Sequence, residues 1–247
     1  MAGHSKWKNI QVRKGAQDAK KGKAFTKVSK EVMLAAKAGG GDPITNSRLR
    51  SAIAAAKAVN LPKDKIETAI KKGTGELAGG NLDEITYEGY GPGGVAILIE
   101  AATDNRNRTV ADVRAIMSKN GGQLGEAGCV GWMFDKKGLI TLDKAAFAED
   151  QVMEAALDAG AEDVLDGDDS WEVHTAPENF EAVRQALEDA GMTPIAADIS
   201  MLPKNTVDVD ADTGRKLLKL MDALDDYDDV QKTHANFELP EALLAEM

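Results

Sequence analysis

Residues 85–102 read ITYEGYGPGGVAILIEAA, and the fold of this chain is best argued outward from them. The β-branched and aromatic residues of 85–90 predict a strand, and the apolar run of 95–102 predicts a second, buried strand. Between them, the Gly-Pro-Gly-Gly of 91–94 predicts a tight turn, because glycine and proline supply the backbone angles that turns need. The stretch therefore predicts a β-hairpin.

The sequence after the hairpin alternates between helical and strand patterns. Residues 109–119 predict a helix and residues 129–134 another strand. The next predicted elements are a strand at 139–142, a helix at 149–159, strands at 163–166 and 171–175, a helix at 178–190 and a strand at 194–200. This βαββαβ order is the ferredoxin-like pattern. A helix at 211–225 and a strand at 230–236 follow it.

The hairpin region lacks one helix and one strand of a ferredoxin-like set, and the last helix and strand complete it. We therefore expect an α+β protein with an N-terminal three-helix bundle and two ferredoxin-like α/β domains, the last inserted in the middle one. The expected boundaries are 1–78 for the bundle, 79–136 plus 205–240 for the middle domain and 137–204 for the inserted domain. The alternative is three sequential domains with a separate C-terminal hairpin.

The segment before the hairpin has helical periodicity and ends at a glycine-rich break over 73–81. Its three apolar faces are Phe25, Val28, Val32 and Ala35, then Leu49, Ala52, Ile53 and Ala56, then Ile66, Ala69 and Ile70. Short amphipathic helices of this kind pack as a bundle. Residues 1–20 are too polar to contribute much core, which leaves a helix across the bundle or a mobile arm.

Basic residues are concentrated in the first 75 positions of the chain, and acidic residues in the rest. The first 75 positions hold 17 of the 30 Lys and Arg residues and five Asp or Glu residues, which is about +12. The other 172 positions hold 13 basic and 36 acidic residues, about −23. A basic segment attracts polyphosphates and an acidic one repels them. The charge pattern therefore predicts a nucleic-acid-binding module on an acidic body.

The candidate phosphate-binding side chains of this module are Lys6, Lys8, Arg13, Lys14, Lys20, Lys21, Lys23, Lys27 and Lys30. Neutralising phosphates with such groups releases counterions and gives affinity that does not depend on base sequence. Trp7 lies between two lysines, where it is suited to stack on an unpaired base. The alternative is a solvated helix face with Trp7 packed on the bundle.

A second basic element, TDNRNRT at 103–109, leads into a helix, whose N-terminus favours anions. Arg106 and Arg108 are its candidate phosphate ligands. The alternative is a capping loop in which Asn107 or Thr109 caps the helix and Arg106 pairs with a carboxylate.

The sequence shows no pattern for catalysis, a cofactor or a metal. Its three histidines have no metal-ligand spacing, and Cys129 within an apolar stretch suggests a buried small side chain. The acidic run at 225–229 suggests a solvated corner. No apolar run approaches the roughly 20 residues of a membrane span. A single cysteine excludes an internal disulfide and fits the cytoplasm.

Several segments carry a resemblance to a known family. They are MAGHSKW at 1–7, KAFTK at 23–27, GGGDP at 39–43, YEGYGPGG at 87–94, TDNRNRT at 103–109 and MLPKN at 201–205. In this order they resemble the YebC family of probable transcriptional regulators, which are cytoplasmic and DNA-binding. The family includes the mitochondrial translational activator of cytochrome oxidase subunit one, and bacterial members have been tied to the ribosome. The resemblance implies three domains, no catalytic residues and a nucleic-acid surface on His4, Lys6, Trp7, Arg13, Lys14 and the following lysines.

Two functions follow as hypotheses. The first is a non-enzymatic, DNA-binding transcriptional regulator whose acidic domains contact protein partners. The second is a ribosome-associated translation factor whose lysines contact rRNA. The second is kept because lysine suits backbone contact better than base reading, which favours arginine. An enzyme built on the ferredoxin-like domains is the weakest hypothesis.

Overall fold

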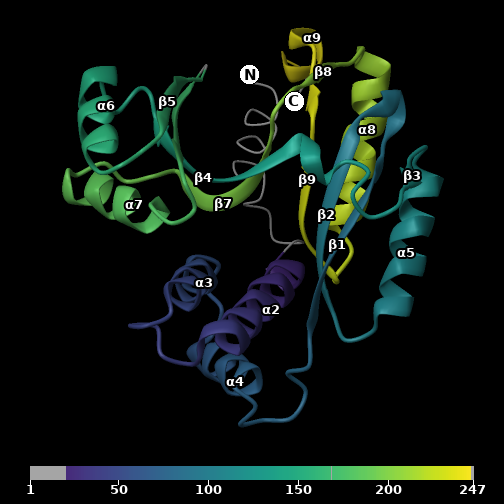
Figure 1. Cartoon of the computed structure of the whole chain (residues 1–247), viewed down its shortest axis with the longest axis horizontal. Helices are drawn as coiled ribbons and strands as arrows, with labels where there is room; N and C mark the ends of the chain where they lie inside the picture. The colour runs from purple at the N-terminus through teal and green to yellow at the C-terminus, as the bar shows by residue number, and fades with distance from the viewer. Residues whose placement is uncertain (1–20, 168, 246–247) are drawn as a thin grey trace. The chain divides into compact units, whose positions relative to one another are not determined.

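The computed structural model describes residues 21–167 and 169–245 and has a mixed α+β fold (Figure 1). The expected α+β class is thereby confirmed. Predictions that concern residues 1–20 lie outside the described residues. Among the described residues, no helix is long and apolar enough to cross a membrane.

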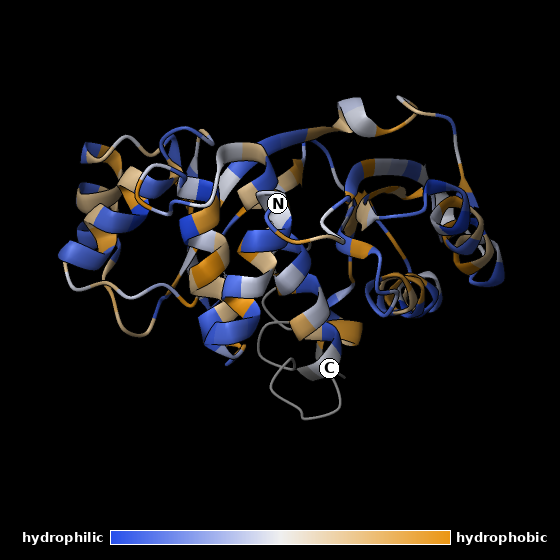
Figure 2. Cartoon of the chain, turned by 90° about the horizontal axis from the view of Figure 1, so that it is seen from below, coloured by the Kyte–Doolittle hydropathy of each residue, from blue (hydrophilic) through white to orange (hydrophobic). Residues whose placement is uncertain are grey.

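Helices α2 (Lys21–Gly39), α3 (Ser47–Ala58) and α4 (Lys63–Gly73) form the bundle. Hydrophobic and hydrophilic residues alternate along helices of the chain (Figure 2), as amphipathic packing requires. The predicted apolar faces meet in one core of Val32, Ala35, Leu49, Ala52, Ile66 and Ala69, with Phe25, Val28, Ile53 and Ile70 packed against it. The buried Asn46 caps α3 by accepting from the Leu49 N–H at 3.0 Å. Its Nδ2 also donates to the carbonyls of Ala35 and Gly40, which joins α2 to α3.

The first sheet has the strand order β3-β1-β2-β9 and is antiparallel throughout. The predicted hairpin is its centre, with β1 at Asp83–Tyr90, the turn at Pro92–Gly94 and β2 at Ala96–Thr103. Gly93 and Gly94 both have positive φ, which explains the glycines of the turn. The outer strands are β3 (Gln123–Leu124) and β9 (Val230–Ala235), and the associated helices are α5 (Arg106–Lys119) and α8 (Ala211–Asp225).

The prediction of a strand at 129–134 is wrong. The third strand of this sheet is β3, and Gly131–Met133 is a short 3₁₀ helix. The cause is Glu88 on β1, whose carboxylate accepts from the N–H groups of Gly128, Val130 and Gly131 at 2.6–2.7 Å. These backbone groups are therefore bonded to a side chain instead of a neighbouring strand.

The second sheet has the order β5-β6-β4-β7, which is that of a βαββαβ ferredoxin-like unit. Its strands are β4 (Phe134–Asp143), β5 (Asp163–Asp166), β6 (Ser170–Thr175) and β7 (Ala196–Pro203), with helices α6 (Glu149–Asp158) and α7 (Phe180–Asp189). Ile140, Leu142, Trp171, Val173, Val183 and Leu187 form the core between sheet and helices.

The first sheet differs from the expected ferredoxin-like order. It has four strands and two helices, but its two central strands are a hairpin, whereas in the second sheet the central pair β6 and β4 is separated by α6 and β5. The reason is the tight turn at Pro92–Gly94, which makes β1 and β2 direct neighbours.

Two compact units divide the chain. One takes Trp132–Val207 and Asn236–Glu238, and the other takes the remaining described residues. The short strands β8 (Val207–Asp208) and β10 (Phe237–Glu238) pair with each other, and α9 (Glu241–Ala245) ends the described chain. On this topology we propose the insertion boundaries given above.

Candidate nucleic-acid interface

The sequence-predicted binding residues fall into two groups. Outside the described residues lie His4, Lys6, Trp7, Lys8, Arg13, Lys14 and Lys20, while Lys21 is the first residue of α2. The structure gives side-chain surroundings for Lys23, Lys27, Lys30, Arg106 and Arg108. All five belong to the unit that contains the bundle and the first sheet.

On α2, the side chains of Lys23, Lys27 and Lys30 follow each other at spacings of four and three residues, so they share one face of the helix. That face meets the acidic run between α8 and β9. Lys23 Nζ lies 3.0 Å from Asp226 Oδ1, and Lys30 Nζ lies 2.7 Å from Asp229 Oδ1. Burial lowers the pKa of Lys27, and the nearby carboxylates of this run act in the opposite direction. The lysine face of α2 therefore already has anionic partners within the protein.

Lys30 is the most completely bound of these lysines. Its ammonium donates to the carbonyls of Ala102 at 3.0 Å and Asp228 at 2.9 Å as well as to Asp229. An ammonium has three donors, so all of them are used. Only 16% of the side chain is exposed. In this arrangement Lys30 joins α2 to the ends of β2 and β9 and has no donor left for a phosphate.

The loop before α5 positions the two arginines. Asn105 is the N-cap of α5, because its Oδ1 accepts from the Arg108 N–H at 3.1 Å. The cap is thus neither Asn107 nor Thr109, the two residues expected in the capping alternative. Thr103 Oγ1 in turn accepts from the Asn105 N–H at 2.9 Å. The helix N-terminus is therefore closed by its own loop.

Both arginines are paired with carboxylates. Arg106 Nε lies 2.9 Å from Asp83 Oδ2, as the capping alternative required, and this bond raises the pKa of Arg106. Arg108 Nη2 lies 2.9 Å from Asp104 and 2.9 Å from Asp229. The hydrogen bond to Asp229, followed by that to Asp104, raises the pKa of Arg108. Arg106 remains largely exposed and Arg108 half-exposed.

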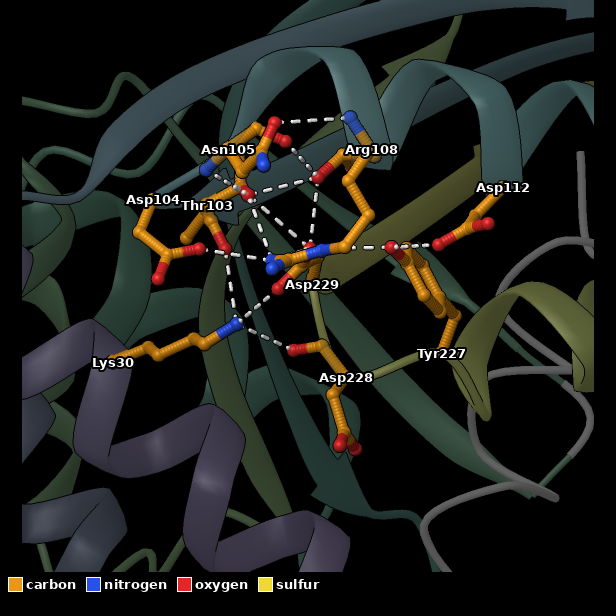
Figure 3. A network of polar contacts seen from close by, with 11 residues as sticks. Lys30, Thr103, Asp104, Asn105, Arg108, Asp112, Tyr227, Asp228 and Asp229 are labelled. Atoms are coloured by element: carbon orange, nitrogen blue, oxygen red, sulfur yellow. Dashed lines mark hydrogen bonds and ion pairs between the residues drawn. The ribbon is translucent and has the colours of Figure 1, made fainter.

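Asp229 is the centre of this polar network, and Figure 3 shows Lys30 and Arg108 directed toward it from two elements. Its Oδ2 also accepts from Thr109 Oγ1 at 2.8 Å. Burial opposes ionisation of this carboxyl, but the bonds from Lys30, Arg108 and Thr109 outweigh burial and hold its pKa well below the ordinary range. The side chain is 8% exposed.

Tyr227 closes the far side of the network. Its hydroxyl donates to Asp112 Oδ2 at 2.7 Å and lies 3.2 Å from Asp229 Oδ2. Burial raises the pKa of Tyr227 to about 12, and the two carboxylates contribute in the same direction. The phenol therefore stays neutral at physiological pH and acts as a hydrogen-bond donor.

Sequence reasoning missed the role of the acidic run. The expected solvated corner is wrong for Asp229, which is buried, and Asp226 is bonded to Lys23. The sequence does contain the two patterns that form this contact, lysines at helical spacing over 23–30 and the acidic run at 225–229. Only their proximity in the fold connects them. Among the described residues, no cluster of His, Cys, Asp or Glu is arranged to hold a metal ion.

Comparison with known proteins covers almost the whole chain. The model for the "TACO1/YebC protein N-terminal domain" matches residues 5–76, and that for the "TACO1/YebC second and third domain" matches residues 82–237. A "Probable transcriptional regulatory protein" of Solidesulfovibrio magneticus is 63% identical over 98% of this chain and 99% of its own length. A protein of the same name from Maridesulfovibrio salexigens is 61% identical over 100% and 99%.

A solved structure is also similar to this chain in sequence and in fold. The crystal structure of a conserved hypothetical protein from Aquifex aeolicus has 45% sequence identity and a TM-score of 0.83, covering 91% of this chain and 93% of that one. The matched segments include the bundle and both sheets of the fold described above. This chain therefore belongs to the TACO1/YebC family.

Proposed function

We propose that this protein is a non-enzymatic, nucleic-acid-binding regulator of transcription that works in the cytoplasm. The observation that carries the proposal is the basic charge of about +12 over the first 75 residues of an otherwise acidic chain. Relatives that share more than 60% of the sequence over nearly its full length are named probable transcriptional regulatory proteins, which supports the same function.

The ion pairs of the described lysines and arginines indicate which residues are left to bind the nucleic acid. Lys23 and Lys30 are bonded to carboxylates, as are Arg106 and Arg108. We therefore assign the main contacts with the phosphate backbone to Lys6, Lys8, Arg13, Lys14, Lys20 and Lys21, with Trp7 and His4 beside them. Lysines suit backbone contact, so most of the binding energy is expected to be independent of base sequence.

A salt series tests the proposal. Binding of a fluorescent DNA duplex is measured between 50 and 200 mM salt, where six to ten phosphate contacts lower affinity by roughly 10³ to 10⁵. Changing Lys6, Lys8, Arg13 and Lys14 to Ala should flatten this slope. The matched control changes four exposed lysines of the acidic part, Lys119, Lys136, Lys216 and Lys219, and should leave it unchanged. A flat slope for the unaltered protein would contradict the proposal.

The same variants separate transcription from translation. In sucrose gradients at low salt, a transcriptional regulator stays near the top, away from the ribosomes. In a separate gel-shift assay, it retards promoter DNA. Co-sedimentation with ribosomes that is lost only in the N-terminal variant would instead favour the rRNA-contacting alternative.

A further inference from the structure

The bundle has a hollow that the ion-paired network does not include. It is an open depression of about 510 Å³ lined by Pro43, Ile44, Arg50, Ile53, Ala54 and Lys57. Four of these come from α3 at spacings of three, one and three residues, which places them on one face of the helix. The opposite stripe of α3, with Leu49, Ala52 and Ala56, is buried in the bundle core. The hollow is therefore the outward face of α3, covered on one side by the loop before it.

The floor and wall of the hollow are apolar. The Ile44 side chain in the loop is 84% exposed, although burying an isoleucine side chain is energetically favourable. Ile53 is half-buried and completes the apolar surface. The loop is held in place by Arg50, whose Nη1 donates to the carbonyls of Pro43 at 2.9 Å and Ile44 at 3.3 Å. The exposed isoleucine is thus held in position by an arginine.

The charges at the rim are positive. Within the described chain, the Lys57 ammonium has no carboxylate in ion-pair distance, in contrast to Lys23 and Lys30. Arg50 uses one terminal nitrogen for the loop, and its planar guanidinium has further N–H groups for bidentate contact with a phosphate. Among the residues that the structure describes, no carboxylate lines this hollow.

A second hollow on the same bundle has the opposite balance of charges. That depression, of about 340 Å³, is lined by three carboxylates, those of Asp42, Glu67 and Glu76, and by one cation, Lys71. Its charge repels a phosphate. Of the two hollows, only the one on α3 combines an apolar surface with unopposed cations.

We propose that the α3 hollow binds one unpaired nucleotide, with the base against Ile44, Pro43 and Ile53 and its phosphates on Arg50 and Lys57. This inference rests on the proposed function and specifies its ligand as a single-stranded segment. A base inside a duplex keeps its faces stacked on neighbouring bases, so it has no face to offer to the hollow.

The test uses the full-length protein and two fluorescent probes, a thirty-nucleotide oligo-dT and a blunt DNA duplex of fifteen base pairs, which carry nearly the same number of phosphates. Ile44→Ser should weaken oligo-dT binding by about three- to tenfold and leave duplex binding within twofold, since only the unpaired base uses the apolar surface. Lys57→Glu should weaken oligo-dT binding by a similar factor. Lys65→Glu on α4, an exposed lysine outside the hollow, is the control of equal charge change.

The outcomes distinguish this inference from the function on which it rests. If both hollow variants bind oligo-dT like the unaltered protein while the steep salt slope persists, the hollow is not the site and the proposed function stands. If Ile44→Ser weakens both probes equally, the base contact is refuted. If the unaltered protein binds neither probe, both proposals fail. If Ile44→Ser instead abolishes self-association in sedimentation equilibrium, a second copy of the chain occupies the hollow and the inference is overturned.

Discussion

At the residue scale, Asp229 has the largest structural role of any ionisable side chain in the described network. It accepts bonds from a lysine on α2, an arginine on α5 and a threonine on the first turn of α5. Charged hydrogen bonds in a poorly exposed site contribute more than those at the surface. This carboxylate is one of several links between the bundle and the sheet, beside the Arg48–Glu84 ion pair and the apolar contact of Met33 and Leu34 with Leu82 and Ala102.

Replacing Asp229 with Asn should therefore be costly. We expect Asp229→Asn to lower the free energy of unfolding by about 2–3 kcal/mol, because the charge that Lys30 and Arg108 face is removed. The matched control is Asp226→Asn in the same acidic run, whose pair with Lys23 is largely exposed and is expected to contribute less than about 1 kcal/mol. Urea unfolding measures both. Equal losses for the two variants would contradict the central role of Asp229.

The pH dependence follows from the lowered pKa of Asp229. A carboxyl whose pKa is lower in the folded than in the unfolded state stabilises the fold above its ordinary value of 3.8 and loses this contribution as the pH falls toward the lowered value. The stability difference between the unaltered protein and Asp229→Asn should thus be constant from pH 7 to 5 and shrink below about pH 4. Urea unfolding at pH 7, 5, 4 and 3 checks this, and a difference that grows with acidity would refute it.

At the element scale, the bundle depends on the close approach of α4 to α2. A Cβ added at Gly73 would lie 2.3 Å from the Met33 carbonyl oxygen and 2.8 Å from the Ala36 Cβ. Both obstacles belong to α2, and one is backbone, so neither can rotate away. The glycine at the end of α4 is therefore required by packing.

This contact predicts opposite effects for two glycines. Gly73→Ala should lower the free energy of unfolding by at least about 2 kcal/mol, since the helices must separate. Gly22→Ala on α2, where an added Cβ has nothing within 4 Å, should be neutral or raise stability by a few tenths of a kcal/mol. Circular dichroism during thermal unfolding compares them. A neutral Gly73→Ala would show that the bundle tolerates a wider helix spacing.

At the scale of the whole molecule, the two compact units have separate hydrophobic cores. Leu187 on α7 is fully buried in the core of the second sheet, and Leu217 on α8 is fully buried in the other unit. Stability is not uniform across such a chain, because each core opens with its own free energy.

Core truncation should therefore act locally. Leu187→Ala is expected to cost about 2–5 kcal/mol in its own unit and to speed amide hydrogen exchange in β4 and β6, with β1 and β2 unchanged. Leu217→Ala should give the reverse pattern. Faster exchange in both sheets for either variant would mean that the two units unfold as one.

Much of this architecture was predictable from local pattern. The strand at 163–166 and the helix at 211–225 have the bounds that periodicity predicts. The strand expected at 129–134 failed because Glu88, about forty positions earlier, binds the backbone there. Periodicity reports which faces are apolar, but it contains no information on such distant hydrogen bonds.

The sequence by itself determined the helices, most of the strands, the family and the division of charge. Only the tertiary structure decided which cations of the described chain have anionic partners. Lys30 and Asp229 are 199 positions apart, and they meet because α2 packs beside the end of β9. Coulomb energy depends on distance in space and on exposure to water, neither of which a linear charge count contains. For that reason Lys23 and Lys30 on α2 serve the fold, while the Lys57 ammonium on α3 has no carboxylate partner within the described chain.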